Sequence, residues 1–434
     1  MEANTLIGSH SRPPSKAGAL AKRERSLAYI MLLPTFFIVL GIVLLPLLAN
    51  FWISFKPVTL GDLRAAQPVV NERIRPRPKA AGDEGVLRYR VRNSSKKDQL
   101  YAVSFTDVLP SGLEVTNLHE SCRINGSVLT CRLGDLEGGS RLDIEMETRV
   151  SQVYIDSGEQ ARASKPVLAY EAENSLTNLE FSLDNFNKIF SAREFWQVLR
   201  VSLYYTIFGT LGALVMGLFA AQLLNTAFRG RIILRGLFLF PYVAPVIAVA
   251  FAWVLLLDAG PGGTFNAMLQ QMEVSDGPIN FLGKRSVDVH LFGFNFAFPV
   301  ALTTVIIFES WRYFPLAFLF ILARMQSISS EIYEAAEMDG ATPFQQFWYL
   351  SIPQLLGILS ILFLLRFIWT FNKFDDIFLL TGGAAGTRTL TVDVYEQAFA
   401  VSNLGAGAAV AVVVFFVLLF FSLIFFKFSP KDDG

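Results

Sequence analysis

Long apolar stretches alternate with polar ones along this chain. Six of them reach the length of about 20 residues that a helix needs to cross a bilayer. They are Leu27–Phe51, Val198–Leu224, Leu234–Leu257, Phe298–Leu322, Ile352–Leu380 and Ala406–Phe426. A single stretch of this kind would also fit a buried helix of a soluble protein. Six in one chain predict an all-α polytopic membrane protein with six core transmembrane helices.

The pattern changes between the first and second apolar stretches. Residues 56–185 are mostly polar and contain short runs in which apolar and polar positions alternate, such as 86–92, 101–107 and 141–147. Alternation of this kind, with turn residues between the runs, is typical of half-buried strands. We therefore expect an all-β insertion with a β-sandwich at about 85–150, preceded by a Pro- and Arg-bearing linker at Arg73–Lys79.

The basic residues near the ends of the apolar stretches predict how the chain crosses the membrane. They gather in the tail 1–26, in the loop that holds Arg229, Arg231 and Arg235, and around the tail 429–434. Six crossings place all of these on one side, and Lys and Arg favour the cytoplasm. The segment 27–55 is then an uncleaved first helix, both termini are cytoplasmic, the insertion is extracytoplasmic, and residues 186–428 form the five-helix remainder of a bacterial inner-membrane protein.

Composition excludes several classes of function. The 434 residues are 53% hydrophobic and 17% charged, with a formal net charge of zero, so the partner surface is the lipid bilayer and not nucleic acid. Two Cys and three His cannot build a Cys-rich metal site. The sequence has no GxxxxGK[ST] motif for binding ATP. We expect no metal, no cofactor and no enzymatic activity in this chain.

The two cysteines lie on either side of a turn that can be built in two ways. If Gly126-Ser127 is the two-residue loop, Cys122 lies directly opposite Cys131, at a separation that a disulfide can bridge. If Asn125-Gly126 is the loop, the two cysteines lie diagonally and too far apart. An extracytoplasmic location favours the disulfide.

The loop between the fourth and fifth apolar stretches, about 325–350, carries an ordered motif. It reads Glu334-Ala-Ala-Glu-Met-Asp-Gly340, followed by Leu350-Ser-Ile-Pro353. The motif resembles the EAA loop of the membrane subunits of bacterial ATP-binding-cassette (ABC) importers, which docks into a groove on the ATPase. The resemblance implies an ATPase-coupling role for Glu334, Ala335, Ala336, Asp339, Gly340 and Pro353. An ordinary solvated acidic helix is the alternative reading.

A second motif follows in the fifth apolar stretch. Phe371-Asn-Lys-Phe374 and then Thr381-Gly-Gly383 resemble the corresponding region of carbohydrate-importer permeases of the maltose and glycerol-phosphate type. Lys373 stands where those permeases commonly have a second Asn, and Ala384-Ala385 stands where they have Gly-Pro. The resemblance implies four partners: a second permease subunit, two ABC ATPase subunits, and an extracytoplasmic solute-binding protein.

Ionisable residues inside apolar spans are costly and usually face a cavity or a partner charge. Lys373, Asp376 and Arg366 are therefore candidates for the solute pathway, and the resemblance to the carbohydrate permeases implies the same role for Asn372. The alternative is structural, with Lys373 and Asp376 paired to each other. Glu309 and Arg312, three residues apart in the fourth stretch, would form a pair on one helix face.

The insertion has a resemblance of its own. Thr106-Asp-Val-Leu-Pro-Ser-Gly-Leu113, the two cysteines and Gly138-Gly139 resemble an immunoglobulin-like repeat of bacterial surface proteins, over about Gly85 to Val150. The resemblance implies a fold and not an activity. Our hypothesis is a permease subunit that imports a sugar or oligosaccharide. Import of glycerol phosphate or another small polar solute, and a membrane-anchored adhesion or sensor protein, are the alternatives.

Overall fold

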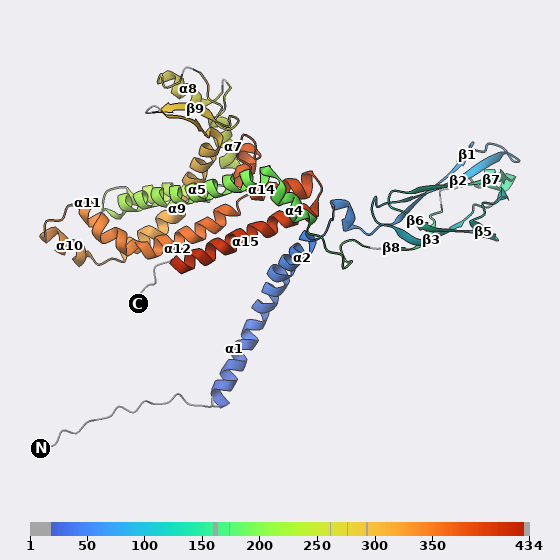
Figure 1. Ribbon diagram of the computed structural model, residues 1–434, viewed down its shortest axis with the longest axis horizontal. Coiled ribbons are helices and arrows are strands. Elements are labelled where there is room, and N and C mark those ends of the chain that lie inside the picture. The colour runs from blue at the N-terminus through green and yellow to red at the C-terminus, as the bar shows by residue number, and fades with distance from the viewer. Residues whose placement is uncertain are drawn as a thin grey trace. The chain divides into compact units, whose positions relative to one another are not determined.

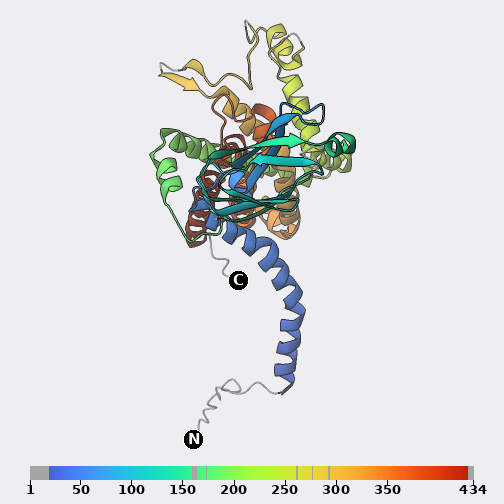
Figure 2. The same ribbon diagram turned by 90° about the vertical axis from the view of Figure 1, so that its right-hand side faces the viewer.

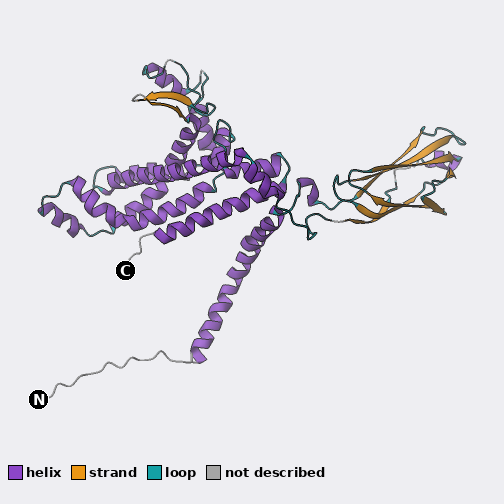
Figure 3. Cartoon of the chain, viewed as in Figure 1, coloured by secondary structure: helices purple, strands orange, loops and turns teal. Residues whose placement is uncertain are grey.

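The computed structural model describes residues 19–158, 164–172, 174–260, 262–275, 277–291 and 294–428. Most of the predicted N-terminal tail and the whole predicted C-terminal tail lie outside these ranges. The chain divides into two units, Met1–Trp52 and Ile53–Gly434, and each is described by itself. Helices make up most of the chain, and the strands are confined to two regions (Figure 3).

The first unit contains one apolar helical segment. Helix α1 (Ala19–Ile38) continues through a π-helical turn (Val39–Leu44) into α2 (Leu45–Ser54), whose last two residues belong to the second unit. The segment Arg23–Ser54 is long and apolar enough to span a membrane. It contains the predicted first helix and extends it by one turn at its N-terminal end, because Arg23, Glu24 and Arg25 continue the helix as a polar turn.

The second unit begins with two antiparallel four-stranded sheets, which form two layers (Figures 1 and 2). One sheet has the strand order β1 (Pro68–Arg75), β2 (Glu84–Asn93), β7 (Arg141–Val150), β4 (Leu113–Asn117). The other has the order β5 (Cys122–Asn125), β6 (Val128–Leu136), β3 (Leu100–Val108), β8 (Val167–Ala172). A short helix, α3 (Gln152–Ser157), follows β7.

Alternation along the strands builds a single core between the two sheets. Leu87, Tyr89 and Val91 of β2 are fully buried, as is Ile144 of β7. They belong to the same buried cluster as residues of β3 and β6, and the ring of Tyr89 lies 4.9 Å from that of Phe105. Since side chains on a strand point to opposite faces in turn, the intervening residues face outward.

The sheets extend beyond the predicted range of 85–150. Strand β1 occupies Pro68–Arg75, so the prediction of a linker from Arg73 is wrong for its first three residues. The cause is Glu72, a carboxylate at an inward position between Val70 and Ile74. This charged residue type interrupts the alternation of apolar and polar positions, so the strand could not be recognised from the sequence. Strand β8, at the other end, has no fully buried residue: Leu168 and Ala172 are half-buried, and the rest are exposed.

The hairpin β5–β6 holds both cysteines. Asn125 pairs with Val128 and Cys122 pairs with Cys131, which is the register with Gly126-Ser127 as the loop. Gly126 has φ 64°, a conformation that glycine adopts without strain. The two cysteines are joined by a disulfide, with Cα atoms 4.0 Å apart.

Two carboxyl groups lie buried in the sandwich beside Tyr89. Glu72 is 6% exposed and lies opposite Tyr89 in the β1–β2 register, and Asp107 is 2% exposed and accepts a hydrogen bond of 2.7 Å from the Tyr89 hydroxyl. Burial, together with the charge of Asp107, raises the pKa of Glu72 to about 8. Glu72 therefore holds a proton in the folded domain at neutral pH.

This pKa predicts how the stability of the insertion depends on pH. Unfolded, Glu72 returns to its ordinary pKa of 4.5, so the folded state binds the extra proton between about pH 4.5 and 8. Stability should therefore fall as pH rises through this window, and Glu72→Gln should remove that part of the fall. Pulse proteolysis of the full chain in urea at pH 5 and pH 8 measures it. Glu84→Gln, at an exposed carboxylate, is the control and should leave the pH dependence unchanged.

The rest of the second unit is a helical bundle, preceded by α4 (Asp184–Ser191). Its long helices are α5 (Arg193–Asn225), α9 (Val300–Gln326), α12 (Ile352–Phe371) and α15 (Leu404–Phe428). They run side by side (Figure 1), and each lies in a segment long and apolar enough to span a membrane. This confirms the prediction of a polytopic helical membrane protein.

Small residues bring α5 and α9 together. A Cβ on Gly209 would lie 2.9 Å from the Glu309 side chain, and one on Gly217 would lie 2.7 Å from the Ala317 side chain. Ser310 lies against Gly212 in the same way. Packing through glycine and other small residues is the usual means by which helices approach closely in a membrane.

The third apolar stretch is bent and not straight. Helices α6 (Arg231–Val243) and α7 (Val246–Leu256) meet at 93°, so the described residues contain five candidate spans, or six if this pair counts as one. Pro245 explains the break, because proline lacks the N–H that would continue the α6 hydrogen bonds and disfavours a helical residue before it. A short helix α8 (Thr264–Gln271) and the hairpin of β9 (Val287–Leu291) and β10 (Phe294–Phe298) follow.

The fifth apolar stretch is also interrupted. The prediction of one span to Leu380 is wrong, because α12 ends at Phe371 and a separate helix α13 (Asp375–Thr381) begins four residues later. Asp375 and Asp376 lie in the first turn of α13, where negative charge is favoured by the helix dipole. Helix α14 (Leu390–Tyr395) and a π-helical turn (Glu396–Ala400) lead to α15.

Candidate coupling loop and buried charge network

The segment between α9 and α12 contains a short exposed helix, α10 (Ser330–Met338). Ser329 caps its N-terminus by accepting a hydrogen bond from the Glu331 N–H, and Glu331 in the first turn complements the helix dipole. Glu334 and Ala335 are exposed and Ala336 is half-buried. Three of the predicted coupling residues, Glu334, Ala335 and Ala336, therefore lie on this helix, and Asp339 and Gly340 form its end.

The helix ends in a tight hydrogen-bonded turn. Gly340 has φ 78°, and its N–H donates to the Glu337 carbonyl at 2.9 Å while the Ala341 N–H donates to the Ala336 carbonyl at 2.9 Å. This pair of bonds is the Schellman motif. The C-cap residue is Asp339, and the motif needs positive φ at the residue that follows it, which is Gly340. A capping box between Thr342 and Gln345 then starts α11 (Pro343–Gln346).

The loop is fastened to the spanning helix that follows it. The hydroxyl of Tyr333 in α10 lies 2.9 Å from that of Ser351, in the π-helical turn Phe347–Ser351 that leads into α12. Arg324, near the end of α9, donates to the Gln354 carbonyl at 3.3 Å. Pro353 lies just after this π-helical turn, within the continuous helical segment Pro343–Phe371. Short contacts therefore join α10 and the end of α9 to the segment that leads into α12.

Large apolar side chains around the turn are exposed. Met338 is 89% exposed, Tyr349 76% and Phe344 71%. Met338 lies outside the candidate spans, whereas Phe344 and Tyr349 lie in the first two turns of the candidate span Pro343–Phe371. Exposed apolar groups gathered at one place are typical of a surface that contacts another protein or lipid.

A buried ion pair lies at the centre of the bundle. Arg366 of α12 donates to Glu309 of α9 at 2.5 Å, and both side chains are at most 1% exposed. Thr370 donates to the same carboxylate at 2.9 Å, and Tyr205 of α5 donates to its other oxygen at 3.0 Å. Glu309 of α9 is thus bound by side chains of two other helices, α5 and α12, as a charge in a membrane interior requires.

A second set of charges surrounds Asp376, which is fully buried at the start of α13. Its nearest cations are Arg312 at 3.9 Å and Lys373 at 4.0 Å. The ammonium group of Lys373 also lies 4.3 Å from the centre of the Tyr313 ring, within range of a cation–π interaction. Arg312 also donates a hydrogen bond of 3.3 Å to the Ala244 carbonyl, at the bend between α6 and α7.

These contacts correct the predicted partners. Glu309 and Arg312 do not form the intrahelical pair, because Glu309 turns toward Arg366 of α12 and Arg312 toward Asp376 of α13. Arg366, predicted as a pathway candidate, is a buried partner of Glu309. Lys373 keeps some exposure, with 19% of its side chain accessible.

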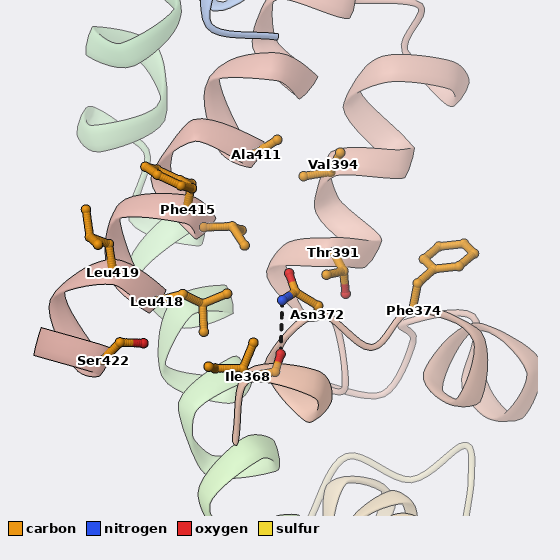
Figure 4. Close-up of a pocket in the computed structure, with 11 residues that line it drawn as sticks. Ile368, Asn372, Phe374, Thr391, Val394, Ala411, Phe415, Leu418, Leu419 and Ser422 are labelled. Carbon is orange, nitrogen blue, oxygen red and sulfur yellow. Dashed lines mark hydrogen bonds between the residues drawn. The ribbon is translucent and has the colours of Figure 1, made fainter. Parts of the chain in front are cut away.

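Asn372 lies on a different side from Lys373. It lines a cavity of about 450 Å³ formed by α12, α14 and α15, together with Ile368, Thr391, Phe415 and others (Figure 4). Its side-chain amide donates to the Ile368 carbonyl at 2.9 Å, as the dashed line in Figure 4 shows. The two neighbouring residues were expected to line one pathway, and the structure separates them.

Reasoning from the sequence missed Tyr205, Tyr313 and Thr370. Tyrosine and threonine are ordinary in apolar spans, and only the partner charges give these three a role. Glu309 and Arg366 were visible as charges inside apolar stretches. Charge of opposite sign at mid-span in two helices was the signal that could have paired them.

The chain has relatives among characterised proteins. It is 36% identical over 241 residues to the inner membrane ABC transporter permease protein YcjO of Escherichia coli, covering 54% of this chain and 75% of that protein. It is 32% identical over 247 residues to the trehalose/maltose transport system permease protein MalF of Thermococcus litoralis, covering 56% of this chain and 78% of that protein.

A solved structure has a similar fold. A chain of the bacterial alginate ABC transporter, crystallised with its alginate pentasaccharide-bound periplasmic protein, matches with a TM-score of 0.50 and 20% sequence identity, covering 58% of this chain and 83% of that one. The sequence of residues 213–431 matches the protein family described as the binding-protein-dependent transport system inner membrane component. These residues include the α10 loop and the buried charges. The chain belongs to the family of binding-protein-dependent transport system inner membrane components.

Proposed function

We propose that this chain is the membrane-spanning permease subunit of an ATP-driven importer for a sugar or oligosaccharide. Two relatives are named as sugar permeases, for trehalose/maltose and for multiple sugars, and they support the solute class. As a permease subunit it is a transport component, and ATP hydrolysis occurs on separate chains. The buried polar groups of α9, α12 and α13 are then available to a solute path, and the spanning helices open that path to one side at a time.

The exposed α10 helix carries the proposal. It is capped at its start and closed by a hydrogen-bonded turn at its end, and it presents Met338 outward. The Tyr333–Ser351 contact joins it to the turn that leads into α12. Such a helix can receive a push from an ATPase subunit and pass it to the bundle without bending. Glu334 and Ala335 face the partner, and the turn at Gly340 fixes the direction in which α10 leaves.

The test is solute uptake by a reconstituted complex. The chain is purified with the partners we propose, namely a second permease subunit, two ATPase subunits and a solute-binding protein, and is placed in proteoliposomes. Uptake of labelled maltooligosaccharide or trehalose should require ATP and the binding protein. Uptake that continues without ATP would contradict the proposal.

We place both termini in the cytoplasm and the insertion outside it. Six crossings, counting the bent α6–α7 pair as one, bring the basic loop at Arg229–Arg235 and the α10 loop to the same side as the tails. The insertion then takes the immunoglobulin-like fold in an oxidising compartment, in keeping with its two packed sheets and the Cys122–Cys131 bond. Accessibility of single introduced cysteines to an impermeant thiol reagent, in a Cys-free background, tests this placement.

Lys373 is our candidate for solute contact. Arg312, Asp376 and Glu309 are more deeply buried, whereas Lys373 lies over the Tyr313 ring with its side chain partly accessible. Lys373→Met should abolish uptake while leaving assembly and basal ATPase activity intact. The control Lys427→Met, at the exposed end of α15, should leave uptake unchanged.

A structural role for Lys373 gives a different result. If Lys373 only neutralises Asp376, then Lys373→Met combined with Asp376→Leu removes both charges and restores uptake. Recovery in the double variant would exclude solute contact. Failure of the double variant to recover, with the complex still assembled, supports it.

The cation also favours a second solute class. An ammonium group over an aromatic ring suits an anionic solute such as glycerol phosphate as well as a sugar hydroxyl. Competition of labelled sugar uptake by glycerol phosphate and by neutral glycerol separates the two. If glycerol phosphate inhibits sugar uptake and glycerol does not, the transported solute is an anion.

A further inference from the structure

The outer face of the insertion's first sheet carries a groove that the transport function does not explain. The groove encloses about 510 Å³ and runs across strands β1 and β2. Four arginines line it, together with one carboxylate and one amide: Arg73, Arg75, Arg88, Arg90, Glu145 and Asn71.

Strand register places these arginines on one surface. Leu87 and Tyr89 point into the core, so Arg88 and Arg90 point outward, and on β1 the inward Glu72 and Ile74 leave Arg73 and Arg75 outward. Arg73 lies directly opposite Arg88 in the β1–β2 ladder. Like charges at directly opposite positions repel, and the fold gains nothing from this pair.

The available carboxylates neutralise only part of the charge. Arg88 forms an ion pair with Glu145 of the neighbouring strand β7, and Arg90 forms one with Asp143 of the same strand. Asp143 also forms an ion pair with Arg141. Within the described ranges, no carboxylate lies within ion-pair distance of Arg73 or Arg75. Both belong to β1, which is an edge strand and therefore has only β2 beside it in the sheet. Their guanidinium groups line the groove without a carboxylate to neutralise them.

We propose that this groove binds a small oligoanion, a ligand with two or more carboxylate or phosphate groups. Guanidinium groups bind such oxyanions through two parallel N–H donors, which is why arginine and not lysine predominates where they are recognised. The groove volume falls in the range of small-ligand pockets, about 300–1,000 Å³. A protein partner would instead need a broad surface of about 800 Å² with an apolar centre, which these strands do not offer.

The strand positions of the arginines narrow the choice of ligand further. The Cα atoms of Arg73 and Arg75, two residues apart on one strand, are about 6.8 Å apart, and the Cβ atoms of Arg73 and Arg88 face each other across about 5 Å. A short acidic oligosaccharide, with one carboxylate on each sugar unit, carries charges at comparable intervals. Arg73 and Arg75 are the direct contacts, and Arg88 and Arg90 remain held by Glu145 and Asp143 as the floor of the groove.

Calorimetric titration of the full chain tests the proposal. The chain is held in nanodiscs of neutral phosphatidylcholine and titrated with trigalacturonate, tripolyphosphate and neutral maltotriose. At least one of the two anions should bind, and more weakly as salt is raised. The double variant Arg73→Gln, Arg75→Gln should weaken binding about tenfold or more, since each removes a charged hydrogen-bond donor. Which anion binds decides between carboxylate and phosphate.

A matched pair of arginines on the other sheet provides the control. Arg123 and Arg132 are exposed on β5 and β6 and are remote from the groove in the strand order. Changing both to Gln removes the same charge and should leave the affinity unchanged. The proposal is overturned if neither anion binds at millimolar concentration, if maltotriose binds as well as the anions, or if the two double variants weaken binding equally.

Discussion

Gly340→Pro should leave the permease inserted and assembled but stop ATP-driven uptake. At φ 78° this residue ends α10, and its N–H donates to the Glu337 carbonyl. Proline fixes φ near −65° and has no N–H, so it removes both features of the turn. The helix then loses its fixed direction, and motion of the ATPase is no longer passed to α12. Uptake in proteoliposomes, measured beside ATPase activity, separates coupling from assembly.

The matched variant is Gly340→Asn. Asparagine adopts positive φ more readily than other residues with a side chain, and a Cβ at this position meets no atom within 4 Å. Gly340→Asn should therefore retain most of the uptake. Normal uptake by Gly340→Pro, in an intact complex, would remove the coupling role of the turn.

The second large effect is expected at the centre of the bundle. Arg366→Met leaves Glu309 as a buried charge without its ion-pair partner, although the hydroxyls of Tyr205 and Thr370 still donate to it. Breaking a buried ion pair on one side costs about 3–5 kcal/mol, so the purified protein should unfold at a markedly lower temperature. The control Arg200→Met changes an exposed arginine of α5 and should have little effect.

The double variant isolates the pair itself. Glu309→Gln combined with Arg366→Met removes both charges, and the loss of stability should be smaller than the sum of the two single losses. Additive losses would mean that the two side chains do not interact. The melting temperature in detergent, followed by loss of the monodisperse peak, gives all four values of the cycle.

The sequence predicted the spanning helices because a stretch of about 20 apolar residues leaves few other solutions. It did not predict where two of them break. Pro245 and the acidic pair Asp375-Asp376 were visible, but a proline or a charge inside an apolar stretch fits either a kink or an end. Packing against neighbours decides between these, as at the 93° bend of α6 and α7.

The insertion shows the same limit in its strands. Alternation located β2, β3 and β7, whereas β1 was missed because Glu72 occupies an inward position. Its burial beside Tyr89 and Asp107 depends on strands that are distant in the sequence. The cysteine hairpin had two possible registers, and the structure has the one that places Cys122 opposite Cys131.

In the candidate site, too, local features were predictable from the sequence and contacts between distant helices were not. The α10 loop is local, so its helix and its turn at Gly340 followed from a few consecutive residues. Partners across helices did not follow, since Glu309 and Arg366 are 57 residues apart. Only the fold brings α9 to α12, and the α5 residue packed against both of them, near Glu309 and Thr370, is Gly209, which carries no signal of charge pairing.

Photo-cross-linking from Met338 is the most direct test of the coupling account. This side chain is 89% exposed beside the α10 turn, and p-benzoylphenylalanine in its place should cross-link, in native membranes, to a chain whose peptides contain a GxxxxGK[ST] motif. The same probe in place of Phe420, an exposed residue within the spanning helix α15, should give no such product. A cross-link to an ATP-binding chain from position 338 alone is the result we predict. Equal products from both positions, or none from position 338 in membranes that hold the assembled complex, would contradict the account.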